Sequence, residues 1–269
     1  MTTVMVRNDR THVTWHHYGG RVCTVIVAWK CFPDAPVVVA ANRDELLDRP
    51  SDPPTMLQTD PPRWGGRDRL AGGTWLAVDP AGRVGAVTNR HPGGRLPARD
   101  ASRQSRGRLP LDVLTGDDEA AHRLMQRLQS ADYNPVNVLY VSPDAAYCTS
   151  IDDDLGTRTT SLSPGIHVIT EQDLDDPADP KVIRILQQAG AALGAAANAD
   201  DLAARLRLLL GSHAASGEAG APACIHAPTH GTVSSATVVV STTHGVRYEH
   251  AEGPPCTTPF EVILPSDMA

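Results

Sequence analysis

The sequence predicts an α+β fold built on antiparallel sheets, and three observations lead to that fold class. Runs of β-branched residues come first, two long amphipathic segments follow late in the chain, and β-rich runs return at the end. Several strand-like runs are joined by short turn sequences, which is the pattern of hairpins rather than of parallel crossovers. The sequence contains neither a phosphate-binding loop nor a glycine-rich strand-to-helix motif, so a nucleotide-binding fold is unsupported.

The first expected hairpin joins strands at residues 24–29 and 37–41. The first strand is a β-branched run of the kind found in buried strands, and residues 32–36 contain the Pro and Asp of a turn. Residues 48–63 hold five prolines and few apolar side chains, so we expect a surface loop there.

A second hairpin is expected where residues 74–78 and 83–88 flank the turn sequence Asp-Pro-Ala-Gly. Residues 90–105 predict another loop. Helical spacing follows at residues 107–115 and 117–129, and the second of these segments opens with three acidic residues, which suit a helix N-terminus.

The second half of the chain predicts a hairpin, a helix pair and a final group of strands. Residues 137–141 and 146–151 form the expected hairpin. Apolar residues at helical spacing predict amphipathic helices at residues 180–193 and 199–210. The closing strands are expected at residues 236–241, 246–250 and 260–264.

Composition excludes several classes of protein. Of the 269 residues 41% are hydrophobic, yet the longest apolar runs are far too short to cross a bilayer. The 24 Lys and Arg against 31 Asp and Glu leave a net charge of −7, which argues against nucleic-acid binding. No repeat or long linker divides the chain, so residues 22–269 predict a single domain.

Residues 1–21 differ in character from the rest of the chain. They are polar and lack the apolar stretch of a secretion signal, and the strand-like run begins abruptly at Cys23. We therefore expect either a disordered extension or a start codon assigned too early, with the true start at Val22. Loss of residue 22, or autoproteolysis after it, would leave Cys23 at the N-terminus. The five widely spaced cysteines predict no disulfide framework and favour the cytoplasm.

An N-terminal cysteine carries a nucleophile and a base on one residue. Its α-amino group, with an ordinary pKa of about 7.7–8.0, can accept the thiol proton, and the thiol can then attack an acyl carbon. In an antiparallel hairpin Cys23 would lie opposite residues 43–45. Asp44 could then hold the amine, and Arg43 could hold the thiolate or a substrate carboxylate.

Nine short motifs together resemble the NRDE family, also called the transport and Golgi organization 2 family. The likeness is dense over residues 22–115 and thinner beyond. The matching segments are residues 23–27 (CTVIV), 41–45 (ANRDE), 49–51 (RPS), 65–68 (GGRD), 72–76 (GGTWL), 88–89 (TN), 105–107 (SRG), 133–138 (YNPVNV) and 231–235 (GTVSS).

This resemblance extends to the cysteine branch of the N-terminal-nucleophile (Ntn) hydrolases, and it implies a four-layer αββα sandwich. It also implies Cys23 as nucleophile and base, Arg43 and Asp44 as its orienting pair, and Asn89 as an oxyanion donor. Candidate substrate contacts are Asn42, Trp75, Thr88 and His230. Trp75 could equally cover a sheet edge.

Two functions are therefore expected. The first is hydrolysis or transfer of an acyl group from a small amide or thioester. The second is non-catalytic binding and trafficking of haem, acyl-CoA or lipid, and Glu171 and Val233 favour it because they replace an Asn and an Arg common in the family. The sequence implies no cofactor and leaves the oligomeric state open.

No metal site is expected. Cys224, His226 and His230 have the spacing of soft-metal ligands, but Pro228 prevents a regular helix and a fourth ligand is absent from the local sequence. His12 and His16 have helical ligand spacing, but no third ligand lies near them in the sequence.

Overall fold

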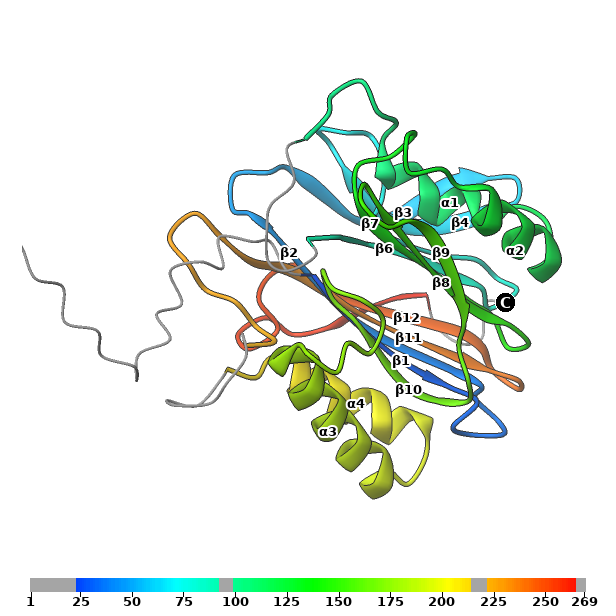
Figure 1. The fold of residues 1–269 in the computed structure, drawn as a ribbon. Helices are drawn as coiled ribbons and strands as arrows, with labels where there is room; N and C mark the ends of the chain where they lie inside the picture. Colours follow the sequence, from blue (N-terminus) through cyan, green and yellow to red (C-terminus); the bar gives the residue numbers. More distant parts are fainter. Residues whose placement is uncertain (1–22, 92–98, 214–221, 265–269) are drawn as a thin grey trace, which may run out of the picture.

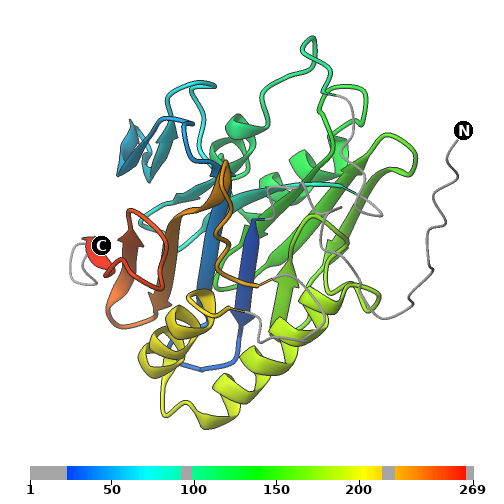
Figure 2. The same ribbon diagram turned by 90° about the vertical axis from the view of Figure 1, so that its left-hand side faces the viewer.

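Two antiparallel sheets lie face to face, with helices on both outer faces (Figures 1 and 2). The computed structural model describes residues 23–91, 99–213 and 222–264; the expectations for residues 1–22 lie outside these ranges. The predicted α+β class is confirmed, and so is the four-layer αββα order that the resemblance implies. Each sheet buries one face against the other sheet and one against helices, which is a stable way to cover two apolar sheet faces.

The first sheet has six strands and positions Cys23. In spatial order they are β10 (Gly165–Ile169), β1 (Thr24–Trp29), β2 (Val37–Leu46), β11 (His230–Ser241), β12 (Gly245–Ala251) and β13 (Glu261–Leu264). Side chains alternate along β1: Val25 and Val27 face the second sheet, whereas Ile26 and Ala28 face the helices α3 (Pro180–Ala195) and α4 (Ala199–Leu210).

The second sheet has seven strands. They are β3 (Ser51–Thr59), β4 (Pro62–Asp68), β5 (Leu76–Val78), β6 (Val84–Asn89), β7 (Val136–Val141), β8 (Ala146–Asp152) and β9 (Gly156–Ser161). A short 3₁₀ turn (Arg106–Arg108), α1 (Leu109–Asp112) and α2 (Asp118–Arg127) lie on its outer face, where Leu114, Met125 and Tyr140 are fully buried.

Side-chain caps explain where three of the helices begin. The carboxylates of Asp117 and Asp179 and the amide oxygen of Asn198 each accept a hydrogen bond from a backbone N–H in the first turn of α2, α3 and α4. A proline in the first turn of α3 adds a fixed helical φ. None of the helices in the described ranges is both long and apolar enough to cross a membrane.

The predicted loop at residues 48–63 is wrong, because the chain forms β3 and β4 there. β3 is the edge strand of its sheet, so its prolines need no ladder partner on the outer side. Its register with β4 shifts between Asp52 and Thr55, where Pro53 and Pro54 interrupt the pairing. Residues 107–115, expected as one helix, form only the 3₁₀ turn and the four-residue α1.

Two further differences concern the length and number of strands. β2 continues to Leu46, so residues 42–45 lie inside the strand rather than after it. β11 begins at His230 and pairs with that extension. The strands β9 and β10 were missing from the sequence-based prediction, and β10 completes the first sheet beside β1.

Candidate functional site

Strand pairing brings Cys23 to residues 43–45. Thr24 pairs with Asn42 in the β1–β2 ladder, so the preceding Cys23 lies beside Arg43. The Cys23 Sγ lies 3.7 Å from the backbone carbonyl oxygen of Asp44. By the alternation of β1, the Cys23 side chain lies on the face turned toward the second sheet.

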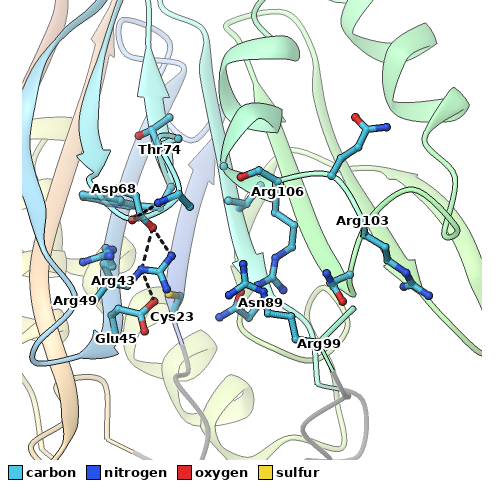
Figure 3. A pocket seen from close by; sticks show the side chains of 18 of the residues that line it. Cys23, Arg43, Glu45, Arg49, Asp68, Thr74, Asn89, Arg99, Arg103 and Arg106 are labelled. Atoms are coloured by element: carbon cyan, nitrogen blue, oxygen red, sulfur yellow. Dashed lines mark hydrogen bonds and ion pairs between the residues drawn. The ribbon is translucent and has the colours of Figure 1, made fainter. Parts of the chain in front are cut away.

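A cavity of about 340 Å³ opens at this end of the two sheets (Figure 3). Cys23, Arg43 and Asp44 line it from the first sheet, and Trp75 and Asn89 line it from the second. The structure therefore brings together the four residues expected to be catalytic and one expected substrate contact. The Asn89 side chain forms no hydrogen bond to another described residue, so its amide is available to a ligand.

The Cys23 thiol is not acidic in this setting. Burial of the sulfur raises its pKa to about 12, and the negative charge of Asp44 acts in the same direction. The Asp44 backbone hydrogen bond and the charge of Arg43 oppose this shift without cancelling it. At neutral pH the sulfur is therefore protonated, and a nearby base must remove the proton before or during attack.

Asp44 has a buried carboxylate, and only one of its two oxygens accepts a hydrogen bond from a described residue. Its Oδ1 accepts a 2.5 Å hydrogen bond from the hydroxyl of Thr232, whereas its Oδ2 is buried and has no partner among the described residues. Burial raises the pKa of Asp44 to about 6, and the charge of Lys181 moderates the rise. A buried carboxylate oxygen without a partner is costly unless a cationic donor occupies the space next to it.

Arg43 lies over an aromatic ring. Its guanidinium carbon lies 4.3 Å from the centroid of the Trp75 ring, within the range of a cation–π contact. One guanidinium nitrogen also donates to the Ser51 hydroxyl at 3.4 Å. Because Trp75 spans the gap from the second sheet to Arg43, it joins the two walls of the cavity.

Arginines outnumber carboxylates around the cavity, five to four. Arg49 binds Asp68 at 2.6 Å and lies 3.5 Å from Glu45, so it is neutralised (Figure 3). Arg103 is paired with Asp153 and Asp100.

Arg106 is different, because no carboxylate of the described residues pairs with it, and its guanidinium donates a 3.0 Å hydrogen bond to the carbonyl oxygen of Pro135. Burial and the charges of Arg99 and Arg49 lower the pKa of Arg106, and the charge of Glu45 opposes this shift without cancelling it. Sequence reasoning missed the role of Arg106 as a site residue. The sequence feature that could have indicated Arg106 is the Ser-Arg-Gly motif at residues 105–107, which belongs to the family resemblance. Gly73 packs so tightly against Gly107 that an added Cβ would come within 2.5 Å of the Gly107 backbone, and this contact sets the depth of the cavity wall.

Three of the expected substrate contacts lie outside the cavity lining. The Asn42 amide donates to the carbonyl oxygens of Leu210 and Ala223, because even-numbered residues of β2 near this end face the helices. The Thr88 hydroxyl donates to the carbonyl oxygen of Thr170, which joins the two sheets. His230 is the first residue of β11. We assign these three residues to the structure around the cavity rather than to substrate contact.

Glu171 and Val233, the two residues that depart from the family pattern, lie in different parts of the structure. Glu171 is buried near Asp44 and Lys181, its pKa is raised by burial, and one carboxylate oxygen has no hydrogen-bond partner in the described chain. Val233 occupies an irregularity of β11, where the register with β2 shifts between Thr232 and Ser234. Neither side chain lines the cavity.

Comparison with known protein families identifies a match that begins one residue before Cys23. The profile of the family described as Transport and Golgi organisation 2 matches residues 22–250. The chain belongs to this family. A Mus musculus member, the Transport and Golgi organization 2 homolog, is 31% identical over 107 residues, which are 38% of this chain and 37% of that protein. The alignment thus spans little more than a third of the mouse protein's length.

Solved structures show the fold of this Transport and Golgi organisation 2 member. A Caenorhabditis elegans N-acylethanolamine-hydrolyzing acid amidase ortholog superposes with a TM-score of 0.50 at 13% identity, covering 80% of this chain and 92% of that one. A variant of the conjugated bile acid hydrolase from Clostridium perfringens gives 0.51 at 7% identity, covering 91% and 94%. At these identities the likeness concerns the Ntn-hydrolase-like fold alone.

Proposed function

We propose that the chain is an N-terminal-cysteine acyl hydrolase that cleaves a small amide or thioester once Cys23 is the first residue. The observation that carries the proposal is the buried Oδ2 of Asp44, which has no partner in the described chain, on a residue whose backbone carbonyl oxygen lies 3.7 Å from the Cys23 Sγ. An α-ammonium group on Cys23 is a donor of the right charge at that position.

The proposed reaction begins with proton transfer on one residue. The neutral α-amine of Cys23 takes the thiol proton, and the sulfur attacks the acyl carbon of the substrate. The carbonyl electrons move to oxygen, and the side-chain amide of Asn89 donates to the oxyanion that forms. A high thiol pKa suits this mechanism, because proton transfer is then coupled to attack instead of preceding it.

Collapse of the tetrahedral intermediate expels the leaving group. The carbonyl reforms, the bond to the amine or thiol leaving group breaks, and the Cys23 α-ammonium returns its proton to that group. Water then attacks the acyl-enzyme, again giving a proton to the α-amine, and a carboxylic acid is released while the thiol is restored. Asp44 orients the amine through both halves of the reaction.

The charge of the cavity favours a substrate that carries an anionic group. Arg106 forms no ion pair with a carboxylate of the described residues, and Arg99 lies close enough to affect the pKa of Arg106. A carboxylate or phosphate on the acyl chain or the leaving group would satisfy Arg106 with charge-assisted hydrogen bonds. The volume of about 340 Å³ limits the buried portion to a small group.

We expect the Arg106→Gln variant to bind anionic acyl substrates about 10- to 100-fold more weakly, since hydrogen bonds to a charged group contribute about 1.5–3 kcal/mol. KM should rise while kcat changes little, because the anionic group lies away from the reacting carbon. Neutral acyl substrates serve as the control. Equal losses for neutral and anionic substrates would contradict this role.

The proposed function is tested with a panel of chromogenic amides and thioesters, neutral and anionic, on protein that begins at Cys23. The two structural neighbours are named as amide or bile acid hydrolases, so amides come first in the panel. We expect turnover that is lost in Cys23→Ala. The matched control Cys31→Ser changes a half-buried thiol in the β1–β2 turn and should keep full activity.

A second function, carriage of haem or acyl-CoA, is favoured by the positively charged cavity and by the loss of two family side chains at Glu171 and Val233. A carrier needs neither the amine nor the thiol. It would bind haem or acyl-CoA equally well before and after Cys23→Ala, and it would turn over no member of the panel.

A further inference from the structure

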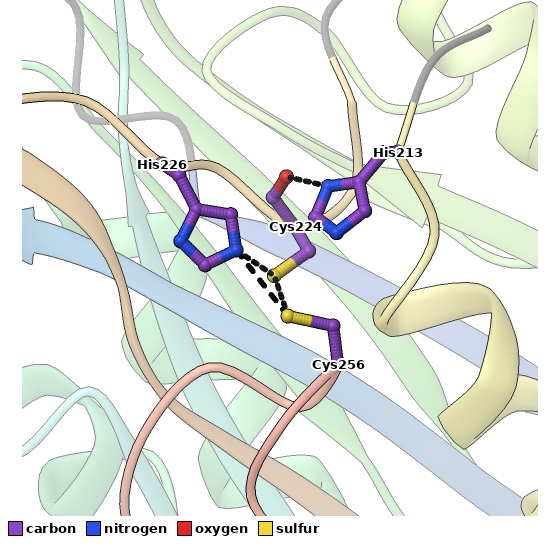
Figure 4. Close-up of side chains that lie close together, drawn as sticks. All are labelled: His213, Cys224, His226 and Cys256. Carbon is purple, nitrogen blue, oxygen red and sulfur yellow. Dashed lines mark hydrogen bonds between the residues drawn. The ribbon is translucent and has the colours of Figure 1, made fainter.

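Four side chains from three separate segments meet outside the cavity, beyond the end of α4 (Figure 4). His213 follows α4, Cys224 and His226 precede β11, and Cys256 lies between β12 and β13. One potential ligand atom from each lies within 4.8 Å of all the others. The sequence-based expectation of no metal took His230 as the third ligand, whereas the fold brings in His213 and Cys256 instead.

We propose that these four residues form a structural zinc site. The Cys224 Sγ lies 3.6 Å from the Cys256 Sγ and 3.6 Å from the His226 Nε2, and the last pair, His226 Nε2 and Cys256 Sγ, is 3.3 Å apart. A tetrahedron with zinc–sulfur bonds of about 2.3 Å and zinc–nitrogen bonds of about 2.0–2.1 Å places its ligand atoms about 3.3–3.8 Å from one another. Three of the ligand atoms already have that spacing.

The remaining histidine is oriented by a backbone hydrogen bond. The Nδ1 of His213 lies 3.2 Å from the carbonyl oxygen of Cys224, so Nδ1 carries the proton and Nε2 keeps its lone pair. A ligand histidine commonly donates its second ring N–H to a carbonyl in this way. Two thiols and two imidazoles form the Cys₂His₂ set of closed structural zinc sites.

The backbone around the cluster is closely packed. A Cβ added at Gly211 would lie 3.3 Å from backbone atoms of Cys256, so the end of α4 directly contacts the β12–β13 connection. The Cys224 N–H donates to the carbonyl oxygen of Ser212 at 3.0 Å. Both contacts hold the ligand segments together before any metal binds, which lowers the ordering cost of binding.

Two hydrogen bonds connect the ligand segment to Asp44, which lines the cavity. The N–H of Ile225, between the two ligands Cys224 and His226, donates to the Thr232 hydroxyl at 2.9 Å, and that hydroxyl donates to Asp44. Zinc would therefore fix the segment that positions Asp44. The proposal does not depend on the reaction, because it rests on the ligand geometry alone.

The test is the metal content of the full chain, purified under reducing conditions after growth with zinc. We expect about one zinc ion per chain, with Co²⁺ producing the visible bands of a tetrahedral thiolate site. Cys256→Ser and His226→Gln should hold at least about tenfold less zinc, and His226 is exposed enough for its variant to fold. Cys31→Ser is the matched control and should hold as much zinc as the wild type.

Two further measurements separate this site from the alternatives. Removing zinc with a chelator should lower Tm by about 5–10 °C in the wild type and leave His226→Gln unchanged. Cys23→Ser should retain zinc, so that loss of hydrolysis and loss of metal are distinguishable. The proposal would be overturned if the reduced wild-type chain took up no stoichiometric zinc. A chain that binds no zinc when reduced and forms a Cys224–Cys256 disulfide in air would overturn it equally.

Discussion

We expect protein that begins at Cys23 to hydrolyse its acyl substrate, and protein that retains residue 22 to show activity lower by at least about 10³-fold. A peptide bond on the Cys23 nitrogen removes the base, and the thiol, whose pKa burial raises to about 12, stays protonated at neutral pH. General-base catalysis contributes about 10²–10⁴-fold, and the lost ammonium also leaves the Oδ2 of Asp44 without a hydrogen-bond partner among the described residues. Both forms can be made in one host, the first by placing a removable Met before Cys23.

The control for this comparison is the folded state of the longer chain. Both forms should unfold cooperatively at similar temperatures, because both contain Thr24–Trp29, which pairs with β2 and β10. Alkylation gives a second readout: the free-amine form should react with iodoacetamide at Cys23 at least about tenfold faster. Equal hydrolysis by the two folded forms would contradict the proposed base.

Replacing Asp44 by Asn should lower kcat/KM by about 10²–10⁴-fold while changing the volume of the site very little. Its backbone carbonyl oxygen lies 3.7 Å from the Cys23 Sγ, and its buried Oδ2 is the acceptor assigned to the α-ammonium. An amide can still accept from Thr232 but brings no charge. Ser51→Ala, which removes only a 3.4 Å contact to Arg43, is a nearby control with a small expected effect.

The pH profile of Asp44→Asn tests the same pairing. Activity requires the neutral amine, so kcat/KM should fall as pH drops through the pKa of the amine, ordinarily about 7.7–8.0. A carboxylate beside an ammonium raises the pKa of that ammonium. Asn at this position should therefore move the acid limb to lower pH by about one unit. A limb that stays in place or moves upward would show that Asp44 does not contact the amine.

The α+β class and the hairpin that carries the site were predictable from local patterns, whereas the four-layer order came from the family resemblance. The turn at residues 32–36 and the β-branched strands on either side of it predict a hairpin, and hairpin register places Cys23 beside Arg43. The prolines of β3 misled the prediction, because an edge strand tolerates them and a single sequence does not reveal which strand is at an edge. Residues 156–169 carry too little alternation to mark β9 and β10 before their partners are known.

What sequence reasoning missed depends on contacts between distant segments. Arg106 points to the cavity because Gly107 packs against Gly73, a contact over more than 30 positions that no local motif reports. His213 and Cys256 join Cys224 and His226 only because α4 and the β12–β13 connection meet. Asn42 was expected at the substrate, but strand alternation turns it toward α4.

The most direct test of the account is the intact mass of protein beginning at Cys23, recorded while it turns over a slow thioester or amide. The account predicts one acyl group per chain, attached to the sulfur of Cys23 and removed as product forms, and none on the Cys23→Ala variant. Turnover without an acyl adduct, or turnover that persists in Cys23→Ala, would contradict the claim that one residue supplies both nucleophile and base.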